Sequence, residues 1–272
     1  MGGRTGQRLW ALVWAVGLVL GLAGAGWAGP VLSRIQERGE LRVGCEPNFP
    51  PLEARAKDGS IIGFDMDLAR HIARAMGVRL KVEAMPLKEL LPALERGELD
   101  LALSGLTITP ERNLKVVFVG PYLVAGQTAL VGREVAGRVR SVADLNHARY
   151  TVVAGAHTTA AEAVRRLLPK ARLVTVPGED QAIKLLLAGK AQAMVADLPF
   201  CTVMAFRHRA QGLVHLDTPF TFEPLGIAMA QGDPDLANWL ANFLTLLRGT
   251  GLLDRMGERW FRDASWMKQL AP

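Results

Sequence analysis

The strongest constraint on the fold of this chain is a repeated alternation of short apolar strands with amphipathic helical segments. In segment 65–76, for example, apolar residues recur at helical spacing and Gly77 follows as a stop signal. Such alternation indicates parallel strands joined by helical crossovers, so we expect an α/β fold. The expected elements of this first series are strands 41–44, 80–84 and 99–103 and helices 65–76 and 87–96.

A second series with a similar order begins after Gln127. Its expected elements are strands 128–131, 150–154, 172–176 and 193–196 and helices 158–168, 180–188 and 198–210. The expected elements that end the chain are strand 227–230 and helices 235–248 and 251–260. Because the two series resemble each other in order, we expect two similar α/β lobes.

The first 28 residues have the pattern of a secretory signal peptide. Arg4 and Arg8 precede an apolar run that starts at Leu9, and small residues lead to a cleavage site after Ala28. We therefore expect residues 1–28 to be removed and the protein to be periplasmic. The alternative is an uncleaved membrane anchor, because the run is about as long as a membrane-spanning helix.

Charge and cysteine content argue against several classes of protein. The formal charge is +6, and it becomes +4 without residues 1–28, which hold two basic residues and no acidic one. No basic run is interleaved with aromatic residues, so we expect no nucleic-acid partner. Cys45 and Cys201 lack metal-site spacing, and the sequence leaves open whether they are free or joined. Without a phosphate loop, a nucleophile–base pair or clustered histidines, we expect no cofactor.

The segment from Ser104 to Arg112 is the best candidate for a binding site. Gly105 lets a ligand approach the backbone, and Thr109 and Pro110 suit the start of a helix. Free amide N–H groups at a helix start attract anions, and Arg112 can grip a carboxylate with two hydrogen bonds. The alternative is an ordinary capped helix with a solvated or salt-bridged arginine.

Several motifs occur in order over residues 31–262 and resemble those of one family. They are Leu41-Arg42-Val43-Gly44, Phe49-Pro50-Pro51, Gly63-Phe64-Asp65-Met66-Asp67-Leu68, the segment 104–112, Pro121-Tyr122, Ala196-Asp197-Leu198-Pro199, Gly251-Leu252-Leu253 and Trp260-Phe261. Together they resemble the polar amino-acid-binding proteins of ABC importers, which are family 3 periplasmic solute-binding proteins. The resemblance implies the two-lobed periplasmic-binding-protein type II fold with two hinge crossings. Lobe 1 would comprise 30–125 and 226–272, and lobe 2 would comprise 126–225.

The resemblance also implies which residues bind the ligand. They are Glu46, Phe49, Leu87, Ser104, Gly105, Thr107, Arg112, His157, Thr158 and Asp197. Arg112 would clamp the α-carboxylate of an amino acid, with help from Thr107 and Thr158. Asp197 would accept the α-ammonium group, helped by Ser104 or by the carbonyl of Gly105. An alternative for Asp197 is a helix N-cap that needs no ligand.

The remaining residues would face the ligand side chain. Phe49 would stack on it, Leu87 would form the opposite wall, and Glu46 would bind a polar group at its far end. Glu46 and Leu87 depart from the residues common in the family, so the resemblance leaves the ligand's identity open. His157 is either a pH-sensitive ligand contact or a solvent-facing residue at a helix start.

The function that follows is capture of an amino acid and its delivery to an ABC permease in the inner membrane. We expect a monomer without enzymatic activity. The alternative is a cyclohexadienyl dehydratase, since these enzymes resemble the same binding proteins and act on prephenate-like acids. They have a glutamate three residues after the position of Asp197, where this chain has Phe200.

Overall fold

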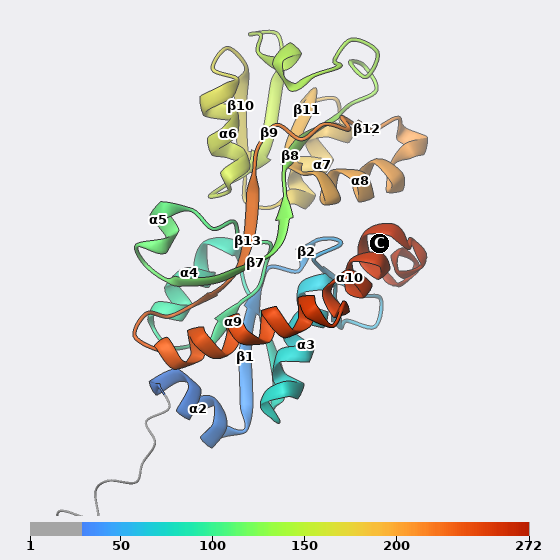
Figure 1. Ribbon diagram of the computed structural model, residues 1–272. Helices are drawn as coiled ribbons and strands as arrows, with labels where there is room; N and C mark the ends of the chain where they lie inside the picture. The colour runs from blue at the N-terminus through green and yellow to red at the C-terminus, as the bar shows by residue number, and fades with distance from the viewer. Residues whose placement is uncertain (1–28, 272) are drawn as a thin grey trace, which may run out of the picture.

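The computed structural model describes residues 29–271, which form two lobes, one above the other in Figure 1. The signal peptide expected at 1–28 lies outside the described residues. Each lobe contains one five-stranded sheet, with strand order β5-β1-β6-β13-β7 in lobe 1 and β10-β9-β11-β8-β12 in lobe 2. The prediction of an α/β fold with two similar lobes agrees with this arrangement.

The sheet of lobe 1 combines strands from the start and the end of the chain. Its strands are β1 (Glu40–Cys45), β5 (Arg79–Ala84), β6 (Leu101–Ala102), β7 (Val117–Ala125) and β13 (Glu223–Met229). Strands β5, β1 and β6 are parallel, whereas β13 runs antiparallel between β6 and β7. The helices of this lobe are α2 (Pro30–Arg38), α3 (Phe64–Met76), α4 (Leu87–Glu95), α5 (Pro110–Asn113), α9 (Pro234–Gly249) and α10 (Leu252–Gly257).

The sheet of lobe 2 follows the predicted second series closely. Its strands are β8 (Gln127–Val131), β9 (Thr151–Gly155), β10 (Arg172–Val176), β11 (Ala193–Asp197) and β12 (Val214–His215). Its helices are α6 (Thr159–Leu167), α7 (Glu179–Leu187) and α8 (Leu198–Arg207). Strands β10, β9 and β11 are parallel, and β8 is antiparallel to both β11 and β12.

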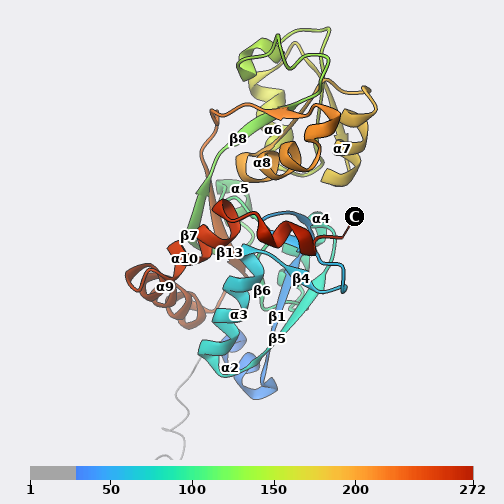
Figure 2. The same cartoon turned by 90° about the vertical axis from the view of Figure 1, so that its right-hand side faces the viewer.

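Alternating side chains divide the lobe 2 sheet between two cores. Val152 and Val195 face a core that includes Val164 of α6, whereas Val153 and Met194 face the core that includes α7 and α8. Successive residues of a strand point to opposite faces, so this pattern buries both sides of the sheet. Figure 2 shows α7 and α8 together on one side of the lobe. The sheet is therefore a rigid platform whose strand ends face lobe 1.

Two extended segments connect the lobes. Strand β7 ends at Ala125 and β8 begins at Gln127, so the chain passes into lobe 2 along one nearly continuous ribbon. It returns after β12 through β13, whose residue Glu223 pairs with Ala125. The two hinge crossings implied by the resemblance are thus adjacent strands.

The structure differs from the sequence-based prediction at several short elements. A small sheet formed by β2 (Asn48–Phe49), β3 (Glu53–Arg55) and β4 (Ile61–Ile62) was not expected, and neither was α2. Such short strands carry too few residues to show alternation. The strand expected at 99–103 pairs only at Leu101–Ala102, and the last expected helix becomes π-helical at Glu258–Arg262. Among the helices of residues 29–271, none has the length and apolar character needed to cross a membrane.

Candidate functional site

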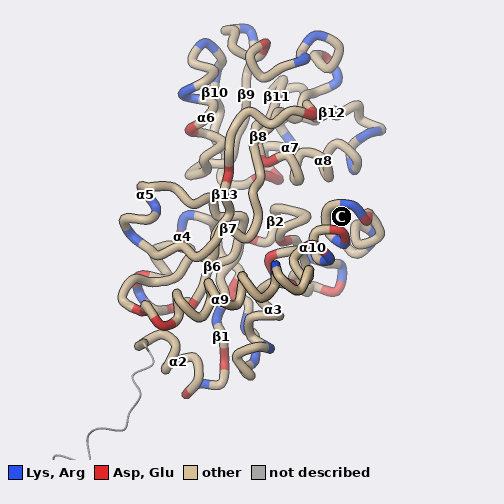
Figure 3. Tube along the Cα trace, viewed as in Figure 1, with Lys and Arg blue, Asp and Glu red and all other residues tan. Residues whose placement is uncertain are grey.

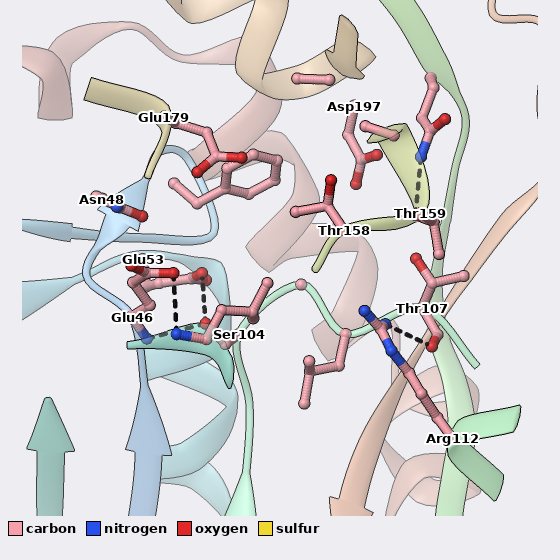
Figure 4. Close-up of a pocket in the computed structure, with 17 residues that line it drawn as sticks. Glu46, Asn48, Glu53, Ser104, Thr107, Arg112, Thr158, Thr159, Glu179 and Asp197 are labelled. Carbon is pink, nitrogen blue, oxygen red and sulfur yellow. Dashed lines mark hydrogen bonds between the residues drawn. The ribbon is translucent and has the colours of Figure 1, made fainter. Parts of the chain in front are cut away.

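A pocket between the two lobes contains most of the predicted ligand-binding residues (Figure 4). Nine of the ten predicted residues line it, namely Glu46, Phe49, Leu87, Ser104, Gly105, Thr107, Arg112, Thr158 and Asp197. His157 instead lines a neighbouring depression, together with Arg112 and Lys115. The pocket also contains Asn48, Glu53, Gln127, Thr159 and Glu179, which the sequence did not single out.

Arg112 enters the pocket from the predicted helix start, which is the single-turn helix α5. Thr109 caps this helix as expected, because its Oγ1 accepts a hydrogen bond of 3.2 Å from the Arg112 amide. The guanidinium donates to the backbone carbonyls of Thr107 at 3.0 Å and His157 at 3.4 Å. Within residues 29–271, no carboxylate forms an ion pair with Arg112. Its charge is therefore held in position with no anionic partner.

Asp197 approaches the same region from lobe 2, at the end of β11 and the start of α8. It occupies the N-cap position, but its side chain accepts no hydrogen bond from the helix. The side chain is buried, and that burial raises the pKa of Asp197 to about 7, with further increases from the nearby charges of Glu223 and Glu179. A buried carboxylate without a partner is costly, so this position favours a cationic ligand group.

A hydrogen-bonded network beside Arg112 joins the two lobes through the return crossing. The buried Glu223 Oε2 accepts hydrogen bonds from Thr107 Oγ1 at 2.8 Å and Thr159 Oγ1 at 3.0 Å. Gln127 Nε2 in turn donates to Thr159 Oγ1 at 2.8 Å. Glu223 could not be identified from the sequence, because residues 107, 159 and 223 meet only in the folded chain.

Ser104 and Gly105 are held from behind by two buried carboxyl groups. Ser104 Oγ donates to Glu53 Oε1 at 2.9 Å, and the Gly105 amide donates to Asp65 Oδ2 at 2.8 Å. Burial raises the pKa of Asp65 to about 6 and that of Glu53 well above its usual value, and the negative charge of Asp65 adds to the shift of Glu53. Gly105 has φ 54, a left-handed conformation that glycine adopts without strain. The turn is therefore fixed before any ligand arrives.

The far end of the pocket is acidic. Glu46 Oε2 accepts a hydrogen bond of 3.1 Å from the Leu87 amide at the start of α4, and the Asn48 side chain also hydrogen-bonds to the Glu46 carboxylate. Burial raises the pKa of Glu46, and it raises the pKa of Glu179 to about 7, with Glu46 as the next contribution. In Figure 4, Glu46 and Glu179 lie at one end of the pocket, and Arg112 and Asp197 lie at the other.

The Phe49 ring stacks on another aromatic ring of the protein, a contact that the sequence did not predict. Its ring stacks on Phe200 of lobe 2, with ring centroids 4.7 Å apart and planes inclined by 5°. One face of Phe49 thus packs across the lobe interface while the residue also lines the pocket. Leu87 lines the same pocket at the start of α4, and the contact of Phe49 and Leu87 with a ligand side chain stays a prediction.

His157 is exposed and has φ 64, the one positive φ outside glycine in the described chain. It contributes its backbone carbonyl, rather than its imidazole ring, to the contact with Arg112. This geometry favours the solvent-facing interpretation over the ligand contact. The direct role of the imidazole stays a prediction.

The two cysteines and the potential metal ligands add no further chemistry to the pocket. Cys45 and Cys201 are buried free thiols, so they are not joined in this structure. Burial raises the pKa of both thiols. Over the described residues, no group of three or more histidine, cysteine, aspartate or glutamate side chains is arranged to hold a metal ion.

Comparisons with known proteins agree with the resemblance noted in the sequence. The model of the bacterial extracellular solute-binding proteins, family 3, matches residues 41–263. The L-cystine-binding protein of Escherichia coli K12 is 26% identical over 92% of this chain and 93% of its own length. A cyclohexadienyl dehydratase of Pseudomonas aeruginosa is 27% identical over 84% of this chain and 85% of its own length.

A solved structure gives a similar result at higher identity. It is described as the binding component of an ABC transporter from Wolinella succinogenes, complexed with lysine. Its sequence is 45% identical to this chain, and the two structures superpose with a TM-score of 0.81. The superposition covers 85% of this chain and 99% of the solved structure's chain. Fold, length and sequence therefore point to the same group of proteins.

Proposed function

Since this chain belongs to the family 3 bacterial extracellular solute-binding proteins, we propose that it captures an amino acid and delivers it to an ABC permease. The relatives named above include a cystine-binding protein and a lysine complex. They support an amino acid as the class of ligand. The pocket geometry supports the same class independently.

The observation that carries this proposal is the placement of two opposite charges without partners. Arg112 and Asp197 enter one pocket from different lobes, and neither forms an ion pair with a charged side chain of residues 29–271. An amino acid leaving water needs both of its charges paired, or its desolvation dominates. An α-carboxylate against Arg112 and an α-ammonium against Asp197 meet that need, with Thr107, Thr158, Ser104 and Gly105 completing the contacts.

We propose that ligand binding closes the lobes, which comprise 30–125 with 226–272 and 126–225. Contacts across the interface already exist, such as the stacking of Phe49 on Phe200 and the bond from Arg112 to the His157 carbonyl. A ligand that contacts both lobes binds the closed form better and shifts the population toward it. Adjacent hinge strands allow such motion without breaking either sheet.

The remaining parts of the proposal concern the protein's surroundings. Members of this family are extracellular or periplasmic, which supports export through a signal peptide at 1–28. The partner that follows is an ABC permease of the inner membrane. We further propose that the protein acts as a monomer, without a cofactor and without a nucleic-acid partner.

The dehydratase remains the competing function because one relative carries that name. One observation disfavours it. The position three residues after Asp197 is Phe200, which is buried and stacked on Phe49 and offers no acid group. In contrast, Glu179 lines the same pocket and its pKa is raised to about 7 by burial, which suits a general acid, so an activity assay is needed to separate the two functions.

The test is calorimetry of the refolded, ligand-free protein against the twenty amino acids, together with an assay of prephenate turnover. We expect micromolar or tighter binding of one chemical group of amino acids and no formation of phenylpyruvate. Absence of binding to every amino acid, combined with turnover of prephenate, would replace the binding function with the enzymatic one.

A further inference from the structure

The pocket contains more negative charge than an amino acid's backbone groups need. Its charged lining residues are Glu46, Glu53, Glu179, Asp197 and Arg112. Arg112 and Asp197 are assigned to the ligand's α-carboxylate and α-ammonium groups. Glu53 accepts a hydrogen bond from Ser104 and lies beside Asp65, and burial raises its pKa well above the usual value, which disfavours its charged form. Two carboxyl groups, those of Glu46 and Glu179, therefore remain unassigned.

Glu179 is buried without a partner, which its position in the sequence does not explain. It is the first residue of α7, where a negative charge interacts favourably with the helix dipole. Asp180 in the same turn already supplies such a charge and is exposed to solvent, so the dipole does not require a buried Glu179. The Glu179 residue is only 7% exposed. Apart from its own amide, no described residue donates a hydrogen bond to it or forms an ion pair with it.

The glycine at position 155 leaves room for this carboxylate. A Cβ atom at Gly155 would lie 2.4 Å from Glu179 Oε1, so any side chain there would displace it. Gly155 ends β9 just before Thr158, which lines the pocket. The carboxylate is thus packed against the pocket wall of lobe 2 instead of extending to solvent, and Figure 4 shows it facing the cavity.

Glu46 approaches the same place from lobe 1. Its Oε2 is occupied by the Leu87 amide, whereas Oε1 lies 3.7 Å from where a Cβ of residue 178 would stand, next to Glu179. Asn48 Nδ2 lies 3.0 Å from the same point, and the Asn48 side chain hydrogen-bonds to Glu46, so it orients this carboxylate at the end of the pocket. Two carboxyl groups on opposite lobes therefore converge at the end of the pocket away from Arg112. Their mutual repulsion opposes lobe closure unless a positive charge lies between them.

We propose that the ligand is an amino acid with a positively charged side chain, whose ammonium or guanidinium group Glu46 and Glu179 bind from the two lobes. This inference rests on the proposed amino-acid function and specifies its substrate class. The cation balances the charge that two carboxylates bring together, and it links the lobes at the end that the α-carbon groups do not reach. Phe49 and Leu87 enclose the methylene groups in between.

The test compares matched ligands that differ in side-chain charge, by calorimetry at pH 8. Arginine is compared with citrulline, and lysine with norleucine. We expect at least one cation to bind about a hundredfold tighter than its neutral counterpart. Equal or tighter binding of both neutral ligands would overturn the inference while leaving an amino-acid function intact. No binding of any amino acid would overturn both proposals.

Variants of the chain assign the charge to its residues. Glu179→Gln should weaken binding of the cation about tenfold or more and leave binding of the neutral analogue within about threefold. Glu46→Gln should act in the same way, because its amide oxygen can still accept from Leu87. Asp235→Asn, at an exposed acidic residue in the first turn of α9, is the matched control and should change neither affinity. Equal losses for cationic and neutral ligands in both variants, with unchanged melting temperatures, would contradict the assigned contact.

Discussion

At one end of the pocket Arg112 and Asp197 offer opposite charges, whereas at the other end Glu46 and Glu179 both offer carboxyl groups. The first arrangement suits any amino acid, because every amino acid carries an α-carboxylate and an α-ammonium group. The second suits only a subset of side chains. Binding of the groups that all amino acids share is therefore separated in space from selection of the side chain. Figure 3 shows acidic positions at the edge of lobe 2 that faces lobe 1, and Glu46 adds a carboxyl group from lobe 1.

The largest effect is expected at the Arg112 end. Arg112→Ala should weaken binding of every amino acid at least about a hundredfold, because it leaves a buried carboxylate without its partner. Calorimetry with one cationic and one neutral ligand measures this. Arg96→Ala, which removes an exposed arginine paired with Glu98, is the control and should have no effect. Selective loss of only the cationic ligand would break the proposed division between the two ends.

The pH dependence of binding tests both ends together. The pKa values of Asp197 and Glu179 are raised to about 7 by burial, so both groups are mostly protonated at pH 6 and mostly ionised at pH 8. Cationic ligand groups bind the ionised forms. We expect binding of a cationic ligand to tighten by roughly tenfold for each carboxyl group between pH 6 and pH 8, with proton release. Calorimetry in buffers of different ionisation enthalpy measures both quantities.

The same shifts determine how the stability of the free protein depends on pH. The folded pKa values exceed the unfolded values of roughly 4, so the folded state binds more protons between about pH 4 and pH 7. These two groups therefore lower the free energy of unfolding as the pH rises through that window. His157→Asn is the control, because asparagine tolerates the positive φ of this position. It removes the histidine and should leave the pH dependence of the free energy of unfolding unchanged. If the affinity for the cationic ligand did not change between pH 6 and pH 8 in either protein, and the free energy of unfolding did not respond to Asp197→Asn or Glu179→Gln between about pH 4 and pH 7, the raised pKa values of these two groups would be contradicted.

The hinge network at Glu223 should have a smaller effect that is equal for all ligands. Glu223→Ala removes the shared acceptor of Thr107 and Thr159 and should weaken binding about tenfold, because it loosens the contact between lobes. Small-angle scattering of the ligand-free variant should show a larger radius of gyration. Glu223→Gln retains an acceptor oxygen and should change affinity much less. Preferential loss of the cationic ligand would assign Glu223 to the selective end instead.

The smallest effect is expected from the cap that positions Arg112. Thr109→Ala removes the acceptor of the Arg112 amide and should lower the free energy of unfolding by about 1 kcal/mol. A loss of affinity of a few-fold should accompany it. Urea denaturation and calorimetry measure the two changes. Thr245→Ala, at an exposed position within α9, should leave the affinity unchanged and should not lower the free energy of unfolding, because alanine is the better helix former.

The sequence allowed prediction of the lobes and of the Arg112 end for a physical reason. Strands and helices of lobe 2 show clear periodicity, and residues 104–112 are contiguous, so their chemistry could be interpreted locally. Thr109 caps α5 as expected. Asp197 was identified only through the family resemblance, because its sequence context equally suits an N-cap.

The acidic end and the hinge network could not be predicted in the same way. Glu179 resembles an ordinary acidic residue in the first turn of a helix, and only burial distinguishes it from Asp180. Glu223 is the first residue of β13, but the strand expected from the sequence began only at residue 227. Phe200 was noted for lacking an acid group, whereas its stacking on Phe49 depends on the two lobes meeting. Contacts between lobes leave no periodic pattern in the chain.

A crystal structure of the protein with its tightest-binding amino acid would locate both ends of the ligand. We expect the α-carboxylate within about 2.7–3.2 Å of the Arg112 guanidinium and the α-ammonium within the same distance of the Asp197 carboxylate. The ligand side chain should extend toward Glu46 and Glu179. A ligand bound in the reverse orientation, or outside this pocket, would contradict the two-lobe clamp.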